Sequence, residues 1–113
     1  MPFPLNWYTM SEAMADIGTA STVRFLVPQD GYLRRVDSSI GAALTGADAV
    51  LTVAHNNTNL TPTITVTQSG SAEGDFDTAE FFRPVKKGDW IEVTTDGGPS
   101  NAVAATIAVT LSG

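Results

Sequence analysis

Apolar and polar residues alternate along much of this 113-residue chain, in short runs that end at turn residues. In the run STVRFLV, Val23, Phe25 and Val27 lie on one face and the residues between them lie on the other. A period of two predicts a strand with one side in a core. The same period recurs in four later runs, whose inward residues are Ala49, Leu51 and Val53; Ile64 and Val66; Ile91, Val93 and Thr95; and Val103, Ala105, Ile107, Val109 and Leu111.

Turn residues divide these runs. Pro28 cannot donate to a strand ladder, and Asp30-Gly31 supplies turn chemistry directly after it. The run YLRRVDSSIGA has no clean parity, which predicts a strand containing a bulge. Seven strands, with a turn about every 8 to 14 residues, predict an antiparallel sandwich or barrel rather than a parallel α/β fold. The long connections leave room for an eighth strand, so we expect an all-β, jelly-roll-like antiparallel β-sandwich.

The N-terminal segment departs from this pattern. Met10, Ala13, Met14 and Ile17 follow helical spacing, and Thr9 with the glutamate three residues later matches a capping box. Residues 1–18 are therefore predicted to form either a short helix or an extended arm, and the pattern does not choose between them. Residues 19–113 are predicted to form a single β-sandwich domain.

Composition excludes several classes of function. The net charge of −6, from 6 Lys and Arg against 12 Asp and Glu, argues against binding to a phosphate backbone. The absence of cysteine removes a disulfide scaffold, a zinc ribbon and a thiol nucleophile. The first ten residues lack the basic and apolar regions of a signal peptide, and no apolar run approaches the roughly 20 residues that cross a bilayer. We expect no nucleic-acid or membrane partner, and synthesis in a cytoplasm.

The residues offer little catalytic chemistry. The single histidine, His55, ends a strand before three polar residues, and no nucleophile or orienting carboxylate stands near it in sequence. We expect it at the surface or an interface, and we expect no catalytic, metal or cofactor site. The loop and strand residues 73–80 hold Glu73, Asp75, Asp77 and Glu80, whose oxygens leave calcium binding open as an alternative to plain solvation.

Aromatic residues point to contacts with other molecules. Trp90 shares the polar face of its strand, so its indole is expected to face away from the core. Trp7 and Tyr8 follow a proline-bracketed segment that is too short to bury them locally. Aromatic side chains are enriched at protein interfaces. The alternative is that the N-terminal aromatics cover one open end of the sandwich. The interface candidates are Trp7, Tyr8, Leu26, Tyr32 and Trp90.

Three stretches, FLVPQDGYLRRV, GADAVLTVAHNNTNL and VKKGDWIEVTTDGGPSNAVAATIAVTL, together resemble small phage virion proteins with a jelly-roll fold. The shared layout is a P-x-D-G turn, an AVLTV strand, a late GD-x-I-x-V strand and a final alternating strand. It extends over about residues 17–111, and it is also similar to C1q- and tumour-necrosis-factor-like jelly rolls, which are typically trimers. Phage proteins of this size are often capsid decoration (cement) proteins.

The resemblance implies a homotrimer that binds the outer capsid surface and stabilises contacts between major capsid subunits. The implied partner is the major capsid protein, and the implied location is the virion after synthesis in the host cytoplasm. An alternative is a carbohydrate-binding module or receptor-binding fibre tip, in which Trp90 or Tyr32 stacks on sugar rings. A small hydrolase ranks last, because no nucleophile–base pair can be assembled around His55.

Overall fold

The computed structural model describes residues 7–113 of the chain. Within this range the chain forms nine strands and no helix, which confirms the all-β class. The strands are β1 (Trp7–Met14), β2 (Ser21–Leu26), β3 (Gly31–Ile40), β4 (Ala49–His55), β5 (Thr58–Asn59), β6 (Ile64–Val66), β7 (Phe76–Val85), β8 (Trp90–Thr95) and β9 (Ala105–Ser112). No helix long and apolar enough to span a membrane occurs in this part of the chain.

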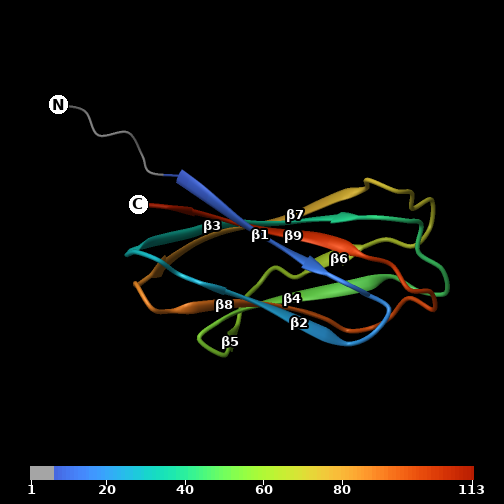
Figure 1. The fold of residues 1–113 in the computed structure, drawn as a ribbon, viewed down its shortest axis with the longest axis horizontal. Coiled ribbons are helices and arrows are strands. Elements are labelled where there is room, and N and C mark those ends of the chain that lie inside the picture. Colours follow the sequence, from blue (N-terminus) through green and yellow to red (C-terminus); the bar gives the residue numbers. More distant parts are fainter. Residues whose placement is uncertain (1–6) are drawn as a thin grey trace.

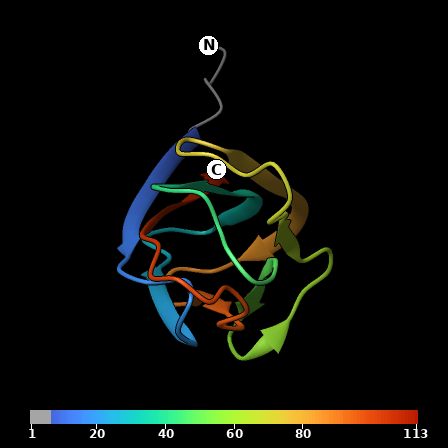
Figure 2. The ribbon, with the colours of Figure 1, turned by 90° about the vertical axis from the view of Figure 1, so that its right-hand side faces the viewer.

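The strands form two antiparallel sheets that stack as the two layers of a sandwich (Figure 1). Sheet A has the order β1-β9-β3-β7. Sheet B has the order β2-β8-β4, and both β5 and β6 pair with β4. Seen along the sandwich, the loops wrap around the gap between the layers and connect one sheet to the other (Figure 2).

The strand pairs are nested in the manner of a jelly roll. β1 pairs with β9, β2 with β8, β3 with β7 and β4 with β6, so the chain resembles one long hairpin whose tip is β5. Two further pairings, β3 with β9 and β4 with β8, close the wrapped hairpin into a four-stranded and a five-stranded layer. This is the double Greek-key arrangement of a jelly roll. The predicted fold is therefore confirmed at the level of topology.

The core lies between the sheets and includes the buried residues of the runs in which alternation predicted an inward face. Leu51, Ile91, Val93, Ile107 and Leu111 have no exposed surface. β9 lies between β1 and β3 within sheet A, and so it contributes inward residues at the centre of the sandwich. Apolar burial of this kind provides most of the favourable free energy of folding.

The N-terminal helix hypothesis is wrong, because residues 7–14 form strand β1 at the edge of sheet A. Met10 and Met14 are four residues apart, a spacing that places them on one face of a helix and equally on one face of a strand. In the strand they pair opposite Val109 and Ala105 and face the core. The hydroxyl of Thr9, expected to cap a helix, instead bonds the Thr110 hydroxyl at 3.0 Å. Residues 1–6, the rest of the proposed arm, lie outside the described residues.

The bulge predicted in the run YLRRVDSSIGA is confirmed. The register of β3 shifts between Leu33 and Arg35 against both of its neighbours, β7 and β9. The shift leaves Arg34 without a cross-strand partner on either side. A bulge re-aims a side chain in this way, and here the residue at the bulge is Arg34.

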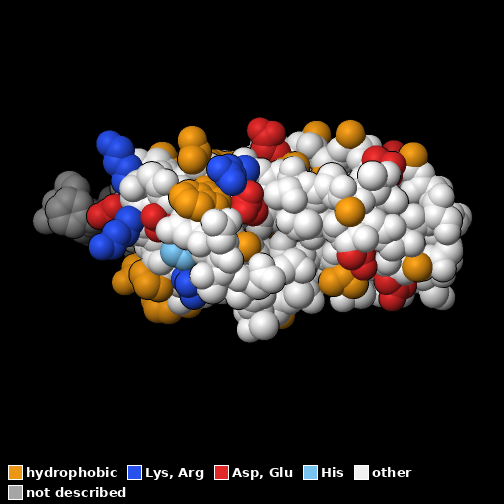
Figure 3. All heavy atoms as spheres, turned by 90° about the horizontal axis from the view of Figure 1, so that it is seen from below, with side chains coloured by type: hydrophobic (Ala, Val, Ile, Leu, Met, Phe, Trp, Pro, Cys, Tyr) orange, Lys and Arg blue, Asp and Glu red, His pale blue; other side chains and the backbone are white. Residues whose placement is uncertain are grey.

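The two ends of the sandwich differ in their connections. We call the turn end the one formed by residues 27–30, 56–57 and 86–89, where β1 also begins and β9 ends. The loop end is formed by residues 15–20, 41–48, 67–75 and 96–104. The four connections of the loop end contain five acidic residues and no Lys or Arg: Asp16, Asp48, Glu73, Asp75 and Asp96. Figure 3 shows Lys and Arg side chains only toward the turn end of the face it presents.

Candidate functional site

Four side chains form a cluster on the outer face of sheet A at the turn end: Trp7 of β1, Tyr32 and Arg34 of β3 and Phe82 of β7. We call it the aromatic cluster. The guanidinium carbon of Arg34 lies 4.6 Å from the centre of the Trp7 ring and 5.0 Å from that of Phe82. The Tyr32 and Phe82 rings stack at 4.7 Å with their planes only 4° apart. One arginine therefore links aromatic side chains from both edges of the sheet.

The cluster is exposed to solvent in this single chain. Trp7 is 45% exposed, Tyr32 37% and Phe82 69%. Contiguous exposed apolar side chains, unlike scattered ones, often mark a surface that binds another molecule. Trp, Tyr and Arg are also the residue types that contribute most to binding energy at protein interfaces. The cation–π contacts hold the rings and the guanidinium in place, so little side-chain entropy remains to be lost on binding.

The structure places the five predicted interface candidates at three locations. Trp7 and Tyr32 belong to the aromatic cluster. Leu26 and Trp90 lie opposite each other on the outer face of sheet B, with Leu26 66% exposed and Trp90 half-buried. Tyr8 is different, because it faces inward opposite Leu111 and packs against the core, where burial raises its pKa. The alternative interpretation, that an N-terminal aromatic covers the sandwich, fits Tyr8.

Trp90 faces outward as predicted, but its ring is not free. The guanidinium of Arg24 lies 5.2 Å from the ring centre and also pairs with Glu92 at 3.0 Å. The indole Nε1 of Trp90 is buried and has no hydrogen-bond partner in the part of the chain that the structure describes. This group is therefore a satisfied Arg–Glu pair lying over a half-buried indole.

Sequence reasoning missed Arg34 and Phe82. In EFFRPV the two phenylalanines are adjacent, so a strand can turn only one of them toward the core. The register of β7 against β3 also shifts at this point. Phe81 packs against the core, whereas Phe82 points outward. The broken parity around Arg34-Arg35 was the available signal, but it gave no indication that Phe82 lies beside Arg34 in the sheet.

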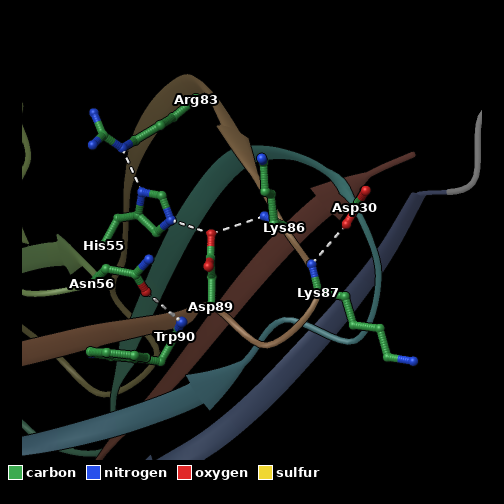
Figure 4. Close-up of polar contacts among 8 residues, drawn as sticks. All are labelled: Asp30, His55, Asn56, Arg83, Lys86, Lys87, Asp89 and Trp90. Carbon is green, nitrogen blue, oxygen red and sulfur yellow. Dashed lines mark hydrogen bonds and ion pairs between the residues drawn. The ribbon is translucent and has the colours of Figure 1, made fainter.

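His55 was predicted to lie at the surface or an interface, and the surface prediction is wrong because the side chain is buried inside the turn end. It is only 9% exposed, because it continues the inward parity of Leu51 and Val53. Its Nε2 donates to Asp89 Oδ2 at 2.8 Å, and its Nδ1 accepts from Arg83 Nε at 2.8 Å (Figure 4). Because arginine can only donate, Nδ1 must carry the lone pair and Nε2 the proton. The orienting carboxylate, absent nearby in sequence, comes from 34 residues away.

This histidine group organises the turn rather than offering a base. Asp89 Oδ2 also accepts from the backbone N–H of Lys86 at 2.9 Å, and Asn56 Oδ1 accepts from the N–H of Trp90 at 3.0 Å (Figure 4). The hydrogen bond from His55 is the main reason that the pKa of Asp89 falls to about 2. Both ring nitrogens of His55 are occupied, so the imidazole cannot accept a proton from a substrate without losing the Arg83 contact.

The acidic segment 73–80 does not converge on one point. Asp75 Oδ2 accepts from the N–H of Ala72 and closes a turn. Asp77 lies on β7 opposite Ser38, and burial together with the nearby Asp75 charge raises its pKa. Among residues 7–113 no group of three or more His, Cys, Asp and Glu side chains is placed to share a metal ion.

No protein-family model matches the chain, and no curated protein matches it. Among solved structures, a chain of the cyanophage Pam1 capsid asymmetric unit is 18% identical with a TM-score of 0.58, over 99% of this chain and 88% of that one. A family 35 carbohydrate binding module from Clostridium thermocellum is 13% identical with a TM-score of 0.52, over 93% and 90%.

A third match is the catalytic unit of a GH87 alpha-1,3-glucanase from Streptomyces thermodiastaticus, 16% identical with a TM-score of 0.56 over 96% of this chain. The chain spans only 26% of that glucanase chain. At these identities the matches show a shared β-sandwich fold, and they do not show a function. The fold implied by the sequence resemblance is thus found in a capsid chain of nearly the same extent, and equally in a carbohydrate binding module.

Proposed function

We propose that this chain is a structural virion protein that binds the outer surface of a phage capsid as a decoration, or cement, protein. The observation that carries the proposal is the exposed aromatic cluster, in which Arg34 holds rings from β1 and β7 across a whole sheet. Such a rigid arrangement suits contact with another protein. The sequence resemblance to small virion proteins and the match to a capsid chain of similar size support it.

In the proposed assembly the chain acts as a homotrimer, and its partner is the major capsid protein. The trimer spans neighbouring capsid subunits and raises the cost of separating them. No catalytic step is part of this function, because the one histidine is committed to Asp89 and Arg83. The first measurement is the mass in solution, for which we expect three times the 11.8 kDa of one chain.

The proposed function is tested with undecorated phage capsids assembled from the major capsid protein of the same phage. We expect saturable binding, density at symmetry-related positions in electron micrographs, and a higher temperature of capsid disruption when the sites are filled. A chain that fails to bind these capsids at micromolar concentration contradicts the proposal.

Carbohydrate binding is the second candidate, favoured by the match to a carbohydrate binding module and by the exposed ring of Tyr32. Sugar rings stack on aromatic faces, but one face of Tyr32 is covered by Phe82, and Arg24 lies over Trp90. This makes the second candidate the weaker one. A glycan array run with and without a chelator tests it: binding that Tyr32→Ala or Trp90→Ala abolishes would favour a carbohydrate-binding module over a decoration protein.

A further inference from the structure

Two arginines of this chain lie over aromatic rings, and only one of them has its charge neutralised. Arg24 lies over Trp90 on sheet B, and its Nε and Nη2 both bond Glu92 Oε2. Arg34 lies over Trp7 and Phe82 on sheet A and makes no ion pair and no side-chain hydrogen bond with any described residue. A guanidinium carries five N–H donors and cannot lose its proton, so Arg34 is a set of donors without an acceptor.

The surroundings of Arg34 specify what could satisfy it. A guanidinium whose face lies against aromatic rings presents its N–H edge, and that edge matches a carboxylate with two parallel hydrogen bonds. Beside it lies a depression of about 350 Å³ lined by Trp7, Arg34, Arg35, Glu80 and Phe81. Arg35 is already paired with Asp37 at 3.0 Å. The free donors are therefore those of Arg34, in a setting of exposed apolar rings.

Charge also distinguishes the two ends of the molecule. The loop end carries five acids and no cation. The three cations that neither form an ion pair nor bond a histidine among residues 7–113 are Arg34, near the start of β3, and Lys86 and Lys87 in the β7–β8 turn. All three lie toward the turn end, whose connections also hold Asp30 and Asp89. A partner with an acidic surface would be repelled by the loop end, since like charges brought together at an interface are costly. Such a partner would contact the turn end with less repulsion.

We propose that the aromatic cluster is the capsid-docking surface, and that Arg34 receives a carboxylate of the major capsid protein while Trp7 and Phe82 cover apolar surface around it. The inference rests on the proposed function and deepens it by naming the face and the partner chemistry. Sheet A at the turn end then faces the shell, and the acidic loop end points away from it.

The chain supplies a matched control for each half of the proposal. Arg34→Gln removes the unsatisfied guanidinium, whereas Arg24→Gln removes one that Glu92 already satisfies. Phe82→Ala removes a ring of the cluster, whereas Phe76→Ala removes an equally exposed ring from the same strand and the same outer face, near the other end. Urea unfolding of all four variants checks that each remains folded.

Binding of each variant to the undecorated capsids is then measured at low and high salt. We expect Arg34→Gln and Phe82→Ala to weaken binding by roughly 30-fold, as hot-spot residues do. Arg24→Gln and Phe76→Ala should stay within about threefold of the unaltered chain. Added salt should weaken capsid binding by the unaltered chain. It should weaken capsid binding by Arg34→Gln less, because that variant has lost the charge contact.

The possible failures are distinguishable. If the unaltered chain binds capsids and all four variants bind as it does, the docking surface is overturned while the decoration function stands. If Arg24→Gln weakens binding and Arg34→Gln does not, sheet B is the docking face and the proposal is equally overturned. If the unaltered chain does not bind capsids, the decoration function itself fails. An Arg34→Lys variant that binds like the unaltered chain would show that a point charge suffices and would refute the paired carboxylate.

Discussion

The turn end and the loop end of the sandwich differ in how their connections are held. At the loop end, carboxylates of the long connections accept hydrogen bonds from other backbone segments. Asp16 accepts from the N–H of Val103, Asp48 from that of Gln68, and Asp96 from that of Val50 in β4. At the turn end the connections are short, covering residues 27–30, 56–57 and 86–89.

This contrast bears on where function is sought. Long loops are the usual place for binding residues, yet here the carboxylates of Asp16, Asp48 and Asp96 are engaged in holding neighbouring backbone segments. The large exposed rings of the aromatic cluster instead project from the strands beside the short turns, and strands position side chains more rigidly than loops do. In this chain the longer connections close one end of the fold, and the strands near the shorter ones carry the candidate contact surface.

The largest expected effect tests how tightly the loop end is packed. A Cβ added to Gly98 would lie 2.2 Å from the carbonyl oxygen of Asp48, so Gly98→Ala must displace backbone. We expect it to lower the free energy of unfolding by about 3 kcal/mol or more. In Gly88→Ala at the turn end the added Cβ meets no atom. This variant should lose only about 1–2 kcal/mol of unfolding free energy, because an alanine is strained at the positive φ of 91°. Urea denaturation of both variants measures the difference, and equal losses would contradict the comparison.

The next effect concerns the histidine group at the turn end. Asp89→Ala leaves the buried Nε2–H of His55 and the N–H of Lys86 without their acceptor, and should cost about 2 kcal/mol of unfolding free energy. Asp30→Ala is the control, because Asp30 accepts only the N–H of Lys87 at an exposed site and its loss should cost less than about 1 kcal/mol.

The same substitution has a defined pH dependence. The pKa of Asp89 is about 2 in the fold and about 3.9 in an unfolded chain, so its contribution is present above pH 4 and is lost as the pH falls toward 2. The stability difference between the unaltered chain and Asp89→Ala should therefore shrink over that interval. A difference that stays constant from pH 6 to pH 2 would show that the carboxylate charge is not what holds the turn.

The smallest effect has the opposite sign. Burial and the Asp75 charge raise the pKa of Asp77, so the ionised carboxylate destabilises the fold at neutral pH. Asp77→Asn should raise the free energy of unfolding by no more than about 0.5 kcal/mol at pH 7. The gain should disappear as the pH falls through the folded pKa, because a protonated Asp77 is neutral as well. Thermal unfolding at pH 7 and pH 4 measures it, and a destabilised variant at pH 7 would be the contrary result.

Several features were predicted correctly because they depend on neighbours in sequence. The inward faces of β2, β4, β6, β8 and β9 follow from a period of two, and the bulge in β3 follows from its broken parity. The short helix, one of the two alternatives for residues 1–18, is wrong, because a spacing of four suits both a helix and a strand. Only the pairing of β1 with β9, about a hundred residues apart, favoured the strand.

The candidate site was much less predictable. Trp7, Tyr32, Leu26 and Trp90 were chosen as aromatic or outward-facing residues, and no pattern indicated which of them would meet. His55 was assigned to the surface or an interface from its polar neighbours, although its parity with Leu51 and Val53 pointed inward. Arg83 and Asp89, its two partners, are 28 and 34 residues away in sequence.

By itself, the sequence determined the strand character, the inward faces and the all-β class, since side-chain alternation and turn chemistry act over a few residues. Tertiary structure alone decided the nested strand order, the meeting of Trp7, Arg34 and Phe82 on one sheet, and the burial of His55 against Asp89. These features depend on contacts between distant segments, which form only when the apolar faces of the two sheets pack together.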